Sequence, residues 1–366
     1  MKNQWMSLSF KSRGAAALAA VLVSGVASAT SLDQNTSWTI QRPGAAPTYR
    51  LVAYGDSIYS GYTGSLFTVG RRAAPFVNGE YLSSRWGSHV EVVRRTRAGA
   101  LARDVYSGKV VAERAYMQTS NTRVVMLEMC GNDYLQARSA FQEQTGTCDY
   151  SGMDAALANC TQYTERALQA INQYATQARV KVVSNLYYPG FDADDVRTAC
   201  TDPVSGTSVH KRSSFLPYLV RGNWRTCQLA EQYGFQCADM FAEFMGADYD
   251  RNGDGVMDRD ALRYKSGEPE ADYVTRITAT LASTLLDANT HFVDASTSYD
   301  YMQSDDTHPT VYLSAVLPLN ATPANGAQGT PEFADGQIVG GRNPQWNKAG
   351  HERMGHANSL FTPASP

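Results

Sequence analysis

Residues 122–130, "TRVVMLEMC", form a near-continuous apolar run, which is typical of a strand buried on both faces of a parallel sheet. Strand-like runs also occur at 50–55 ("RLVAYG"), 89–95 ("HVEVVRR") and 180–188 ("VKVVSNLYY"). Stretches with apolar residues at helical spacing separate the runs, for example at 154–178. This alternation predicts an α/β fold, a three-layer α/β/α sandwich around a central, mostly parallel sheet.

The N-terminal segment has the pattern of an export signal. Three basic residues precede an apolar core at 14–26, and a small-residue cleavage site follows at 27–29. We therefore expect a signal peptide over 1–29 and a secreted or periplasmic protein. Because no other uncharged apolar stretch approaches the length of a bilayer span, the sequence predicts no transmembrane segment.

The rest of the chain is expected to form one large domain. Residues 30–48 are polar and contain proline, so they are interpreted as a loose leader before a single domain over 49–366. A fifth strand is expected within 235–244. The stretch 310–345 is interpreted as a loop insertion at the rim of the active site, serving as a lid or a substrate-binding loop.

Composition narrows the range of partners. The chain of 366 residues has a formal net charge of −3 and no basic stripe, which is atypical of a nucleic-acid-binding protein. With 43% hydrophobic residues it can bury a large core, as expected of a monomeric globular enzyme. The six cysteines are Cys130, Cys148, Cys160, Cys200, Cys227 and Cys237.

An even number of cysteines in an exported protein predicts disulfides, here up to three. The sequence does not determine their connectivity. Proximity along the chain favours bridges within 130–160 and within 200–237.

Residues suited to acyl transfer follow the predicted strands. Ser57 follows the first strand, and a serine hydroxyl becomes a nucleophile when a base such as His308 takes its proton. Asp305, three residues before His308, is placed to orient the imidazole, and Asp306 is the alternative. Taken alone, a serine in this position is more often a helix N-cap than a nucleophile.

The same strand ends offer donors for a tetrahedral oxyanion. Gly99 follows the second strand and Asn132 the third, and carboxyl ends of parallel strands lie at one edge of a sheet. The backbone N–H groups of Ser57 and Gly99 and the side-chain amide of Asn132 are the candidate donors. The chemistry needs no cofactor.

Four blocks in this order resemble the SGNH subgroup of the GDSL-type esterases and lipases. "GDS" (55–57), "AGALARD" (98–104), "GND" (131–133) and "DDTHP" (305–309) resemble the family's four blocks. The resemblance implies a flavodoxin-like three-layer fold and a carboxylic ester hydrolase. It implies a triad of Ser57, His308 and Asp305, and an oxyanion hole of Ser57, Gly99 and Asn132.

Two departures from the family pattern concern the site itself. The third block is usually G-x-N-D, but Cys130 occupies the place of its first glycine, where a disulfide would stiffen the turn. The first block continues "SIYSG", which places Tyr59 beside the expected pocket as a substrate-binding residue.

A second motif, "DYDRNGDGVMDRDALR" (248–263), resembles calcium loops of the EF-hand, dockerin and thrombospondin types. The acidic positions match in spacing, but Ala261 stands where an EF-hand has its bidentate Glu. The motif predicts a structural calcium site in an insertion at about 246–264. Its ligands would be Asp250, Asn252, Asp254 and Asp258.

The sequence thus predicts an exported serine esterase or lipase that acts on a small-molecule, lipid or polysaccharide ester. Two alternatives remain open: an acyltransferase that uses the same site, and a non-catalytic, calcium-dependent binding protein.

Overall fold

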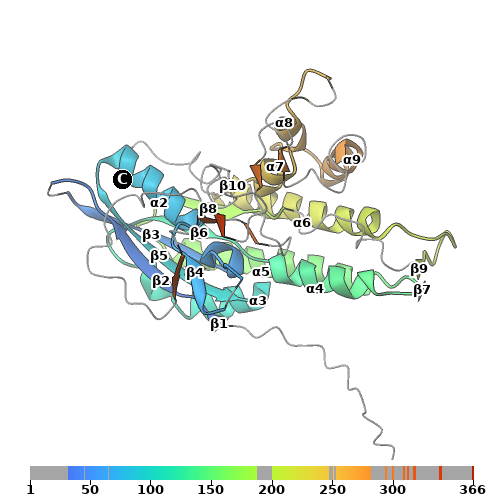
Figure 1. Ribbon diagram of the computed structural model, residues 1–366, viewed down its shortest axis with the longest axis horizontal. Coiled ribbons are helices and arrows are strands. Elements are labelled where there is room, and N and C mark those ends of the chain that lie inside the picture. The colour runs from blue at the N-terminus through green and yellow to red at the C-terminus, as the bar shows by residue number, and fades with distance from the viewer. Residues whose placement is uncertain are drawn as a thin grey trace, which may run out of the picture. The chain divides into compact units, whose positions relative to one another are not determined.

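The computed structural model describes most of the chain between residues 32 and 281 (Figure 1). The described residues are 32–187 without 45 and 65, 200–281 without 247–249 and 251–252, and the short pieces 293–294, 299–300, 308–309, 311–312, 316–318, 338–339 and 365–366.

The main sheet has the strand order β1-β5-β3-β6-β8-β10, with β2 also paired to β5. β5, β3, β6, β8 and β10 run parallel, and β1 and β2 pair antiparallel to β5. This confirms the predicted mostly parallel sheet. The strands are β1 (Leu32–Asp33), β2 (Thr36–Ile40), β3 (Thr48–Gly55), β5 (His89–Ala98), β6 (Thr122–Leu127), β8 (Val180–Ser184) and β10 (Gln236–Ala238).

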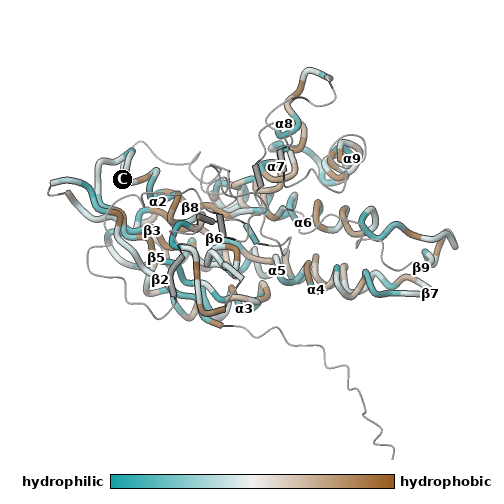
Figure 2. The backbone as a smooth tube through the Cα atoms, viewed as in Figure 1, coloured by the Kyte–Doolittle hydropathy of each residue, from teal (hydrophilic) through white to brown (hydrophobic). Residues whose placement is uncertain are grey.

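Helices cover both faces of the sheet, as the predicted three-layer sandwich requires. Hydrophobic and hydrophilic residues alternate along α4, α5 and α6, so each of these helices has an apolar side (Figure 2). The helices are α1 (Ser57–Ser60), α2 (Ala74–Trp86), α3 (Ala102–Asp104), α4 (Gly131–Gln142), α5 (Ser151–Tyr174), α6 (Lys211–Tyr233), α7 (Met240–Met245), α8 (Asp258–Leu262) and α9 (Glu270–Thr280), with a π-helical turn at Val105–Val111 and a 3-10 turn at Arg114–Tyr116.

Two hydrophobic cores flank the sheet because successive strand residues point to opposite faces. On β3, Val52 and Tyr54 pack in the core formed with α4, α5 and α6. Leu51 and Ala53 pack in the other core, with α2 and α7. All four side chains are fully buried, which explains why this strand appears as an uninterrupted apolar run in the sequence.

Two expectations from the sequence need correction. Residues 30–48 are not a loose leader, because β1 and β2 lie within them and extend the sheet beside β5. Trp38 and Ile40 alternate inward and are buried, although the polar residues around them hide this pattern in the sequence. The fifth strand is only three residues long, and the second half of 235–244 belongs to α7.

Smaller strands complete the described structure. They form two-stranded pairs outside the main sheet. They are β4 (Thr68–Gly70), β7 (Gly146–Thr147), β9 (Cys200–Thr201), β11 (Val293–Asp294), β12 (Tyr299–Asp300), β13 (Val311–Tyr312), β14 (Val316–Pro318) and β15 (Ile338–Val339).

All six cysteines form disulfides, which confirms the predicted number of three. The expected bridges within 130–160 and within 200–237 are present as Cys130–Cys160 and Cys227–Cys237. The third, Cys148–Cys200, joins the two regions and was not favoured by proximity in sequence.

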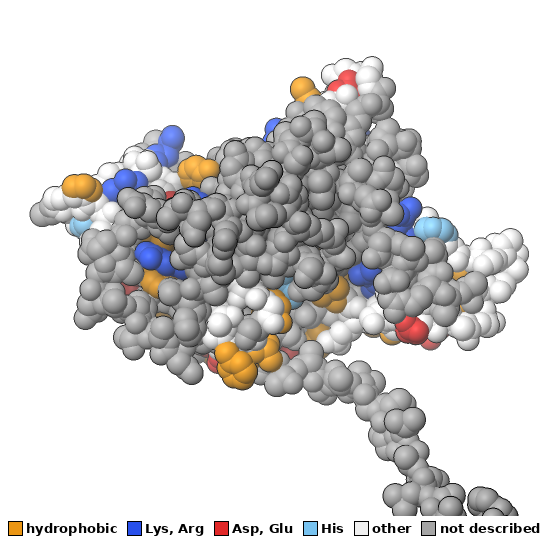
Figure 3. Space-filling view, viewed as in Figure 1, with side chains coloured by type: hydrophobic (Ala, Val, Ile, Leu, Met, Phe, Trp, Pro, Cys, Tyr) orange, Lys and Arg blue, Asp and Glu red, His pale blue; other side chains and the backbone are white. Residues whose placement is uncertain are grey.

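Several predicted segments lie outside the described residues: the signal peptide over 1–29 and most of the loop insertion over 310–345. Among the described residues, no helix combines the length and apolar character needed to span a bilayer. On the face shown in Figure 3, basic, acidic and hydrophobic side chains of the described residues are interspersed in small groups.

Candidate active site

The sheet register brings three loops to one edge. Gly55, the last residue of β3, pairs with Thr96 of β5, and Tyr54 pairs with Leu127 at the end of β6. Three neighbouring strands therefore end at nearly the same level, and the turns after them meet there. These turns carry Ser57, Gly99 and Asn132, as the sequence predicts.

Ser57 begins the short helix α1 and is 7% exposed. Asp56 is the N-cap of this helix, and its Oδ1 accepts a 2.8 Å hydrogen bond from the backbone N–H of Ile58. The end of α1 is held by the buried Arg94, whose Nη1 donates to the carbonyl oxygens of Ser60 and Gly70, each at 2.8 Å. The cap at one end and the guanidinium at the other fix the serine against the sheet edge.

His308 lies next to Ser57. Its Nε2 is 2.9 Å from Ser57 Oγ, the geometry in which an imidazole takes the hydroxyl proton. The ring of Tyr62 packs against the imidazole, with 4.3 Å between the ring centroids. Tyr62 therefore restricts the orientation of His308 from the side of the turn after α1.

Asn132 joins the loops that carry the other site residues. Its Nδ2 donates to Asp56 Oδ2 at 3.0 Å and to the carbonyl oxygen of Ala100 at 2.9 Å. Gly99, directly before Ala100, has a φ of +71°, a left-handed conformation that favours glycine. Both hydrogens of the Asn132 amide thus serve contacts within the site, and donation to an oxyanion would share or replace one of them.

The turn before Asn132 carries the predicted disulfide. Cys130 has a φ of +88° and is the only described non-glycine residue with a positive φ. Its bond to Cys160 ties the N-terminus of α4 to α5. A glycine would adopt this backbone conformation without strain, so the cross-link holds a conformation that the cysteine itself disfavours.

Tyr59 does not line the pocket beside which the sequence placed it as a substrate-binding residue. It is fully buried in the core between the sheet and α2, and its hydroxyl lies 2.6 Å from Ser184 Oγ of β8. On a helix, the side chain two positions beyond Ser57 points to a different side, and here that side is the sheet. Ile58 and Tyr62 take the places near Ser57 that the sequence suggested for Tyr59.

An apolar pocket of about 320 Å³, including space open to solvent, adjoins this edge of the sheet. Ile58 and Gly131 border it and are the sequence neighbours of Ser57 and Asn132. Tyr187 contributes from beyond the end of β8. The other lining residues are Tyr134 and Leu135 of α4, Leu186 and Leu219.

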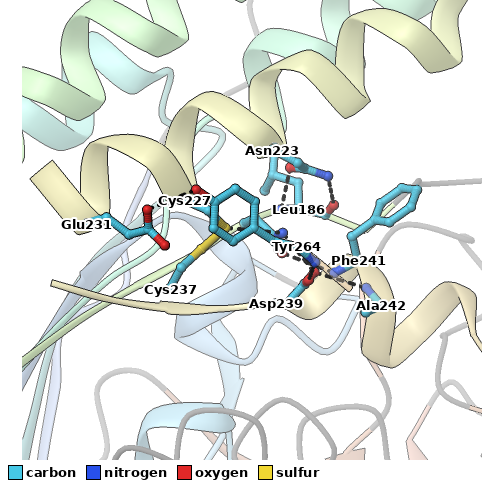
Figure 4. Close-up of a disulfide and its surroundings, with 10 residues drawn as sticks. Leu186, Asn223, Cys227, Glu231, Cys237, Asp239, Phe241, Ala242 and Tyr264 are labelled. Carbon is cyan, nitrogen blue, oxygen red and sulfur yellow. Dashed lines mark hydrogen bonds between the residues drawn. A yellow bond between two sulfur atoms is a disulfide. The ribbon is translucent and has the colours of Figure 1, made fainter. Parts of the chain in front are cut away.

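The far wall of this pocket is fixed by polar contacts (Figure 4). Asn223 of α6 accepts a hydrogen bond from the Leu186 N–H at 2.9 Å and donates to the Leu186 carbonyl at 2.6 Å. The Cys227–Cys237 disulfide ties the same helix to β10. The backbone that positions Leu186 is therefore held independently of any ligand.

A buried acid completes the site and was missed in the sequence. Glu128 follows β6, is 1% exposed and accepts a hydrogen bond from the backbone N–H of Asp56 at 3.3 Å. The signal was a single acidic residue inside the apolar run 122–130. Such a residue is rarely buried unless it is paired.

The surroundings of Asp133 raise its pKa. Burial raises its pKa to about 6, against the opposing effect of the hydrogen bond that its Oδ2 accepts from the Ala102 N–H. It links the N-terminus of α4 to the turn that carries Gly99, and it contributes a negative charge near Asp56.

Two predicted groups of residues are placed only in part. Asp305 and the alternative Asp306 lie outside the described residues, as does Asn252 of the predicted calcium loop. The carboxylate of Asp250 accepts hydrogen bonds from the backbone N–H groups of Gly253, Asp254 and Gly255. Within the described residues, no group of three His, Cys, Asp or Glu side chains is close enough to hold a metal ion, so calcium binding stays a prediction.

The class of protein defined by fold and site is an α/β protein with a serine–histidine pair at the carboxyl edge of a parallel sheet. No protein-family model and no curated protein matches the chain. Among solved structures, a lipase from a goat rumen metagenome is 17% identical with a TM-score of 0.41, and the match covers 64% of this chain and 98% of that one.

A phospholipase A1 from Streptomyces albidoflavus is 19% identical with a TM-score of 0.38, covering 66% of this chain and all of that one. An acetyl-xylooligosaccharide esterase of Geobacillus is 15% identical with a TM-score of 0.34, covering 54% of this chain and 78% of that one. Because these TM-scores are below 0.5, the function has to be argued from the site itself.

Proposed function

We propose that this protein is an exported serine esterase that hydrolyses carboxylic esters through an acyl-enzyme. The observation that carries the proposal is the 2.9 Å contact between His308 Nε2 and Ser57 Oγ at the sheet edge where Asn132 also lies. The resemblance of four sequence blocks to the SGNH esterases and lipases supports the same reaction.

In this reaction Ser57 Oγ attacks the ester carbonyl carbon while His308 Nε2 takes the hydroxyl proton. The tetrahedral intermediate collapses, its bond to the alcohol breaks, and the alcohol leaves with the proton from His308. Water then attacks the acyl-enzyme with His308 as base, which releases the acid and restores Ser57. Asp305 is the residue proposed to accept the other imidazole N–H.

The oxyanion is proposed to bind the backbone N–H groups of Ser57 and Gly99 and the Asn132 amide. The contact of that amide with the Ala100 carbonyl is the one a substrate oxyanion would share, because Ala100 adjoins Gly99. Stabilisation of developing charge by such preorganised donors is usually the largest single contribution to this kind of catalysis.

The pocket supports a substrate with an apolar acyl group. Its lining consists of aliphatic and aromatic side chains, and its border includes Ile58 and Gly131, the neighbours of the nucleophile and of Asn132. A hydrocarbon chain buried there is stabilised by about 0.8 kcal/mol for each CH₂ group. Export is proposed from the N-terminal signal pattern and agrees with three disulfides, which persist in oxidising compartments.

The test is turnover of p-nitrophenyl esters together with labelling by a fluorophosphonate probe. Ser57→Ala should abolish both while leaving the melting temperature nearly unchanged, because only a hydroxyl is removed. Ser107→Ala, which removes an exposed hydroxyl bonded to the Arg103 carbonyl, is the matched control and should keep both. Full activity in Ser57→Ala would refute the proposal.

The same experiments separate the two alternatives. A non-catalytic binding protein would fail to react with the probe although it is folded. An acyltransferase would label at Ser57 but would transfer the acyl group to an added lipid or sugar alcohol in preference to water.

A further inference from the structure

The carboxyl groups of Asp56 and Glu128, next to the nucleophile, are close enough to share a hydrogen bond. Asp56 and Glu128 are each 1% exposed, and they come from the ends of neighbouring strands, β3 and β6. Two glycines leave room for the close approach of these two acids. A Cβ on Gly55 would lie 3.0 Å from Glu128 Oε2, and a Cβ on Gly131 would lie 3.2 Å from Asp56 Oδ2. A larger residue at either position would press against one of the two acids.

Three of the four carboxyl oxygens have identified donors. Asp56 Oδ1 accepts from the Ile58 N–H, Asp56 Oδ2 from the Asn132 amide, and Glu128 Oε2 from the Asp56 N–H. The fourth, Glu128 Oε1, is buried without such a partner among the described residues. A Cβ on Gly131 would lie 4.0 Å from this oxygen and 3.2 Å from Asp56 Oδ2.

A single proton shared by the two acids removes the repulsion between them. Two buried carboxylates in contact repel each other, whereas one proton turns the contact into a charge-assisted hydrogen bond. Glu128 is the better site for that proton, because both oxygens of Asp56 accept N–H donors whereas Glu128 Oε1 has no donor among the described residues. We propose that Glu128 is a positioning residue that works as a neutral acid, donates a hydrogen bond to Asp56, and so holds Ser57 and Asn132 in register.

The electrostatic surroundings agree with this protonation. Burial raises the pKa of Glu128 well above its ordinary value, and the neighbouring Asp56 carboxylate raises it further. Burial also raises the pKa of Asp56, but the Ile58 N–H, Glu128, His308 and the Asn132 amide all oppose the shift. The other acid that acts on Asp56 is Asp133. The pair therefore carries one negative charge, on the Asp56 side, facing His308.

The consequence for catalysis is geometric. Through Asp56, the shared proton connects the cap of α1, which positions Ser57, with the amide of Asn132. Loss of that proton at alkaline pH would place two charges in contact and push the two turns apart. A displacement of about 1 Å in a catalytic group is enough to cost about 100-fold in rate.

The inference rests on the proposed function, and its first test compares two substitutions of one residue. Glu128→Gln has the shape of the neutral acid and still donates through its amide, so it should retain most of kcat and lose the alkaline decline of the wild type. Glu128→Leu keeps the volume without the hydrogen bonds, and kcat should fall by about 100-fold with KM little changed. Glu243→Gln, a buried acid paired with Arg259 and Arg263, is the control and should keep the wild-type pH profile.

A second test does not depend on esterase activity. At neutral pH, the infrared spectrum of the wild type should contain the carbonyl band of a protonated, buried carboxylic acid, and Glu128→Gln should lack it. Absence of that band in the wild type would overturn the inference, as would an unchanged alkaline decline in Glu128→Gln. Wild-type kcat in folded Glu128→Leu would do the same. If Glu128→Leu does not fold, the glutamine variant decides. A wild type that shows the band but hydrolyses no ester would refute the proposed function alone.

Discussion

Nε2 of His308 lies 2.9 Å from Oγ of Ser57, although the two residues are 251 positions apart in the chain. Neither side chain is exceptional in isolation, since a serine after Gly-Asp is a common N-cap. The contact makes the pair a candidate nucleophile and base. It also fixes where the third member of a triad has to act, at the other nitrogen of His308.

The first prediction distinguishes the two candidate acids beside His308. Asp305→Asn should lower kcat for p-nitrophenyl esters by about 10⁴-fold, because the imidazole loses the acceptor that fixes its tautomer. Asp306→Asn changes the adjacent acid in the same way and should have little effect. The opposite ranking would assign the role to Asp306, and two near-normal variants would remove an aspartate from the mechanism.

A second prediction concerns the acyl pocket. Leu135→Phe adds volume at the half-buried pocket wall, so kcat/KM should fall more steeply for long p-nitrophenyl esters than for the acetate. Val111→Phe makes a comparable addition on the π-helical turn, outside the pocket lining. The measurement is kcat/KM across a series of acyl lengths. A parallel change for all lengths in Leu135→Phe would show that acyl chains bind elsewhere.

The third prediction separates the cross-link at Cys130 from the backbone conformation it holds. Replacing Cys130 and Cys160 together removes the disulfide, which should lower the free energy of unfolding by about 3–4 kcal/mol. With glycine at 130 and alanine at 160, kcat should remain close to wild type, because glycine adopts the φ of +88° freely.

The matched variant has alanine at both positions. It should be less stable by a further ~1 kcal/mol and lose more kcat, because alanine disfavours the left-handed turn beside Asn132. Chemical denaturation and steady-state kinetics check both effects. Equal kcat in the two variants would show that this turn does not position Asn132.

A fourth prediction follows from the raised pKa of Asp133. Its pKa is about 6 in the folded protein and 3.8 in an exposed chain, so folding favours the protonated form. The contribution of protonated Asp133 to the free energy of unfolding is fully present below pH 3.8. It is lost as the pH rises through about 6. Asp133→Asn keeps an acceptor for the Ala102 N–H and does not titrate.

The melting temperature of Asp133→Asn should therefore increase relative to that of the wild type as the pH rises across this interval. Asp104→Asn, at a more exposed neighbouring acid, is the control and should follow the wild type. A constant difference between Asp133→Asn and the wild type across the interval would contradict the raised pKa.

The fifth prediction tests the calcium loop by removal of the metal. If Asp250 and its neighbours bind calcium, a chelator should lower the melting temperature, and calcium at about 100 times its Kd should stabilise the protein by about 3 kcal/mol. Asp250→Asn should abolish both effects, whereas Asp272→Asn on α9 should leave them intact. No heat of binding in a calorimetric titration would exclude the site.

The sequence by itself determined the class of fold and three of the loops at the sheet edge. Strands buried on both faces are continuously apolar, and a strand end followed by Gly-Asp-Ser or Gly-Asn-Asp is visible as a local break. It missed β2, because a strand at the side of the sheet alternates polar and apolar residues and only Trp38 and Ile40 turn inward.

Only the tertiary structure determined which side chains at that edge face the pocket and which are buried in the core. Tyr59 and Ile58 are adjacent, yet one is buried against Ser184 and the other lines the pocket, because the direction of α1 relative to the sheet determines which side chain points inward. The Asp56–Glu128 contact likewise joins residues 72 positions apart and depends on the register between β3 and β6. Residue type and order identify the groups that can react, whereas their charge state and partners depend on burial and distance, which arise only when the chain has folded.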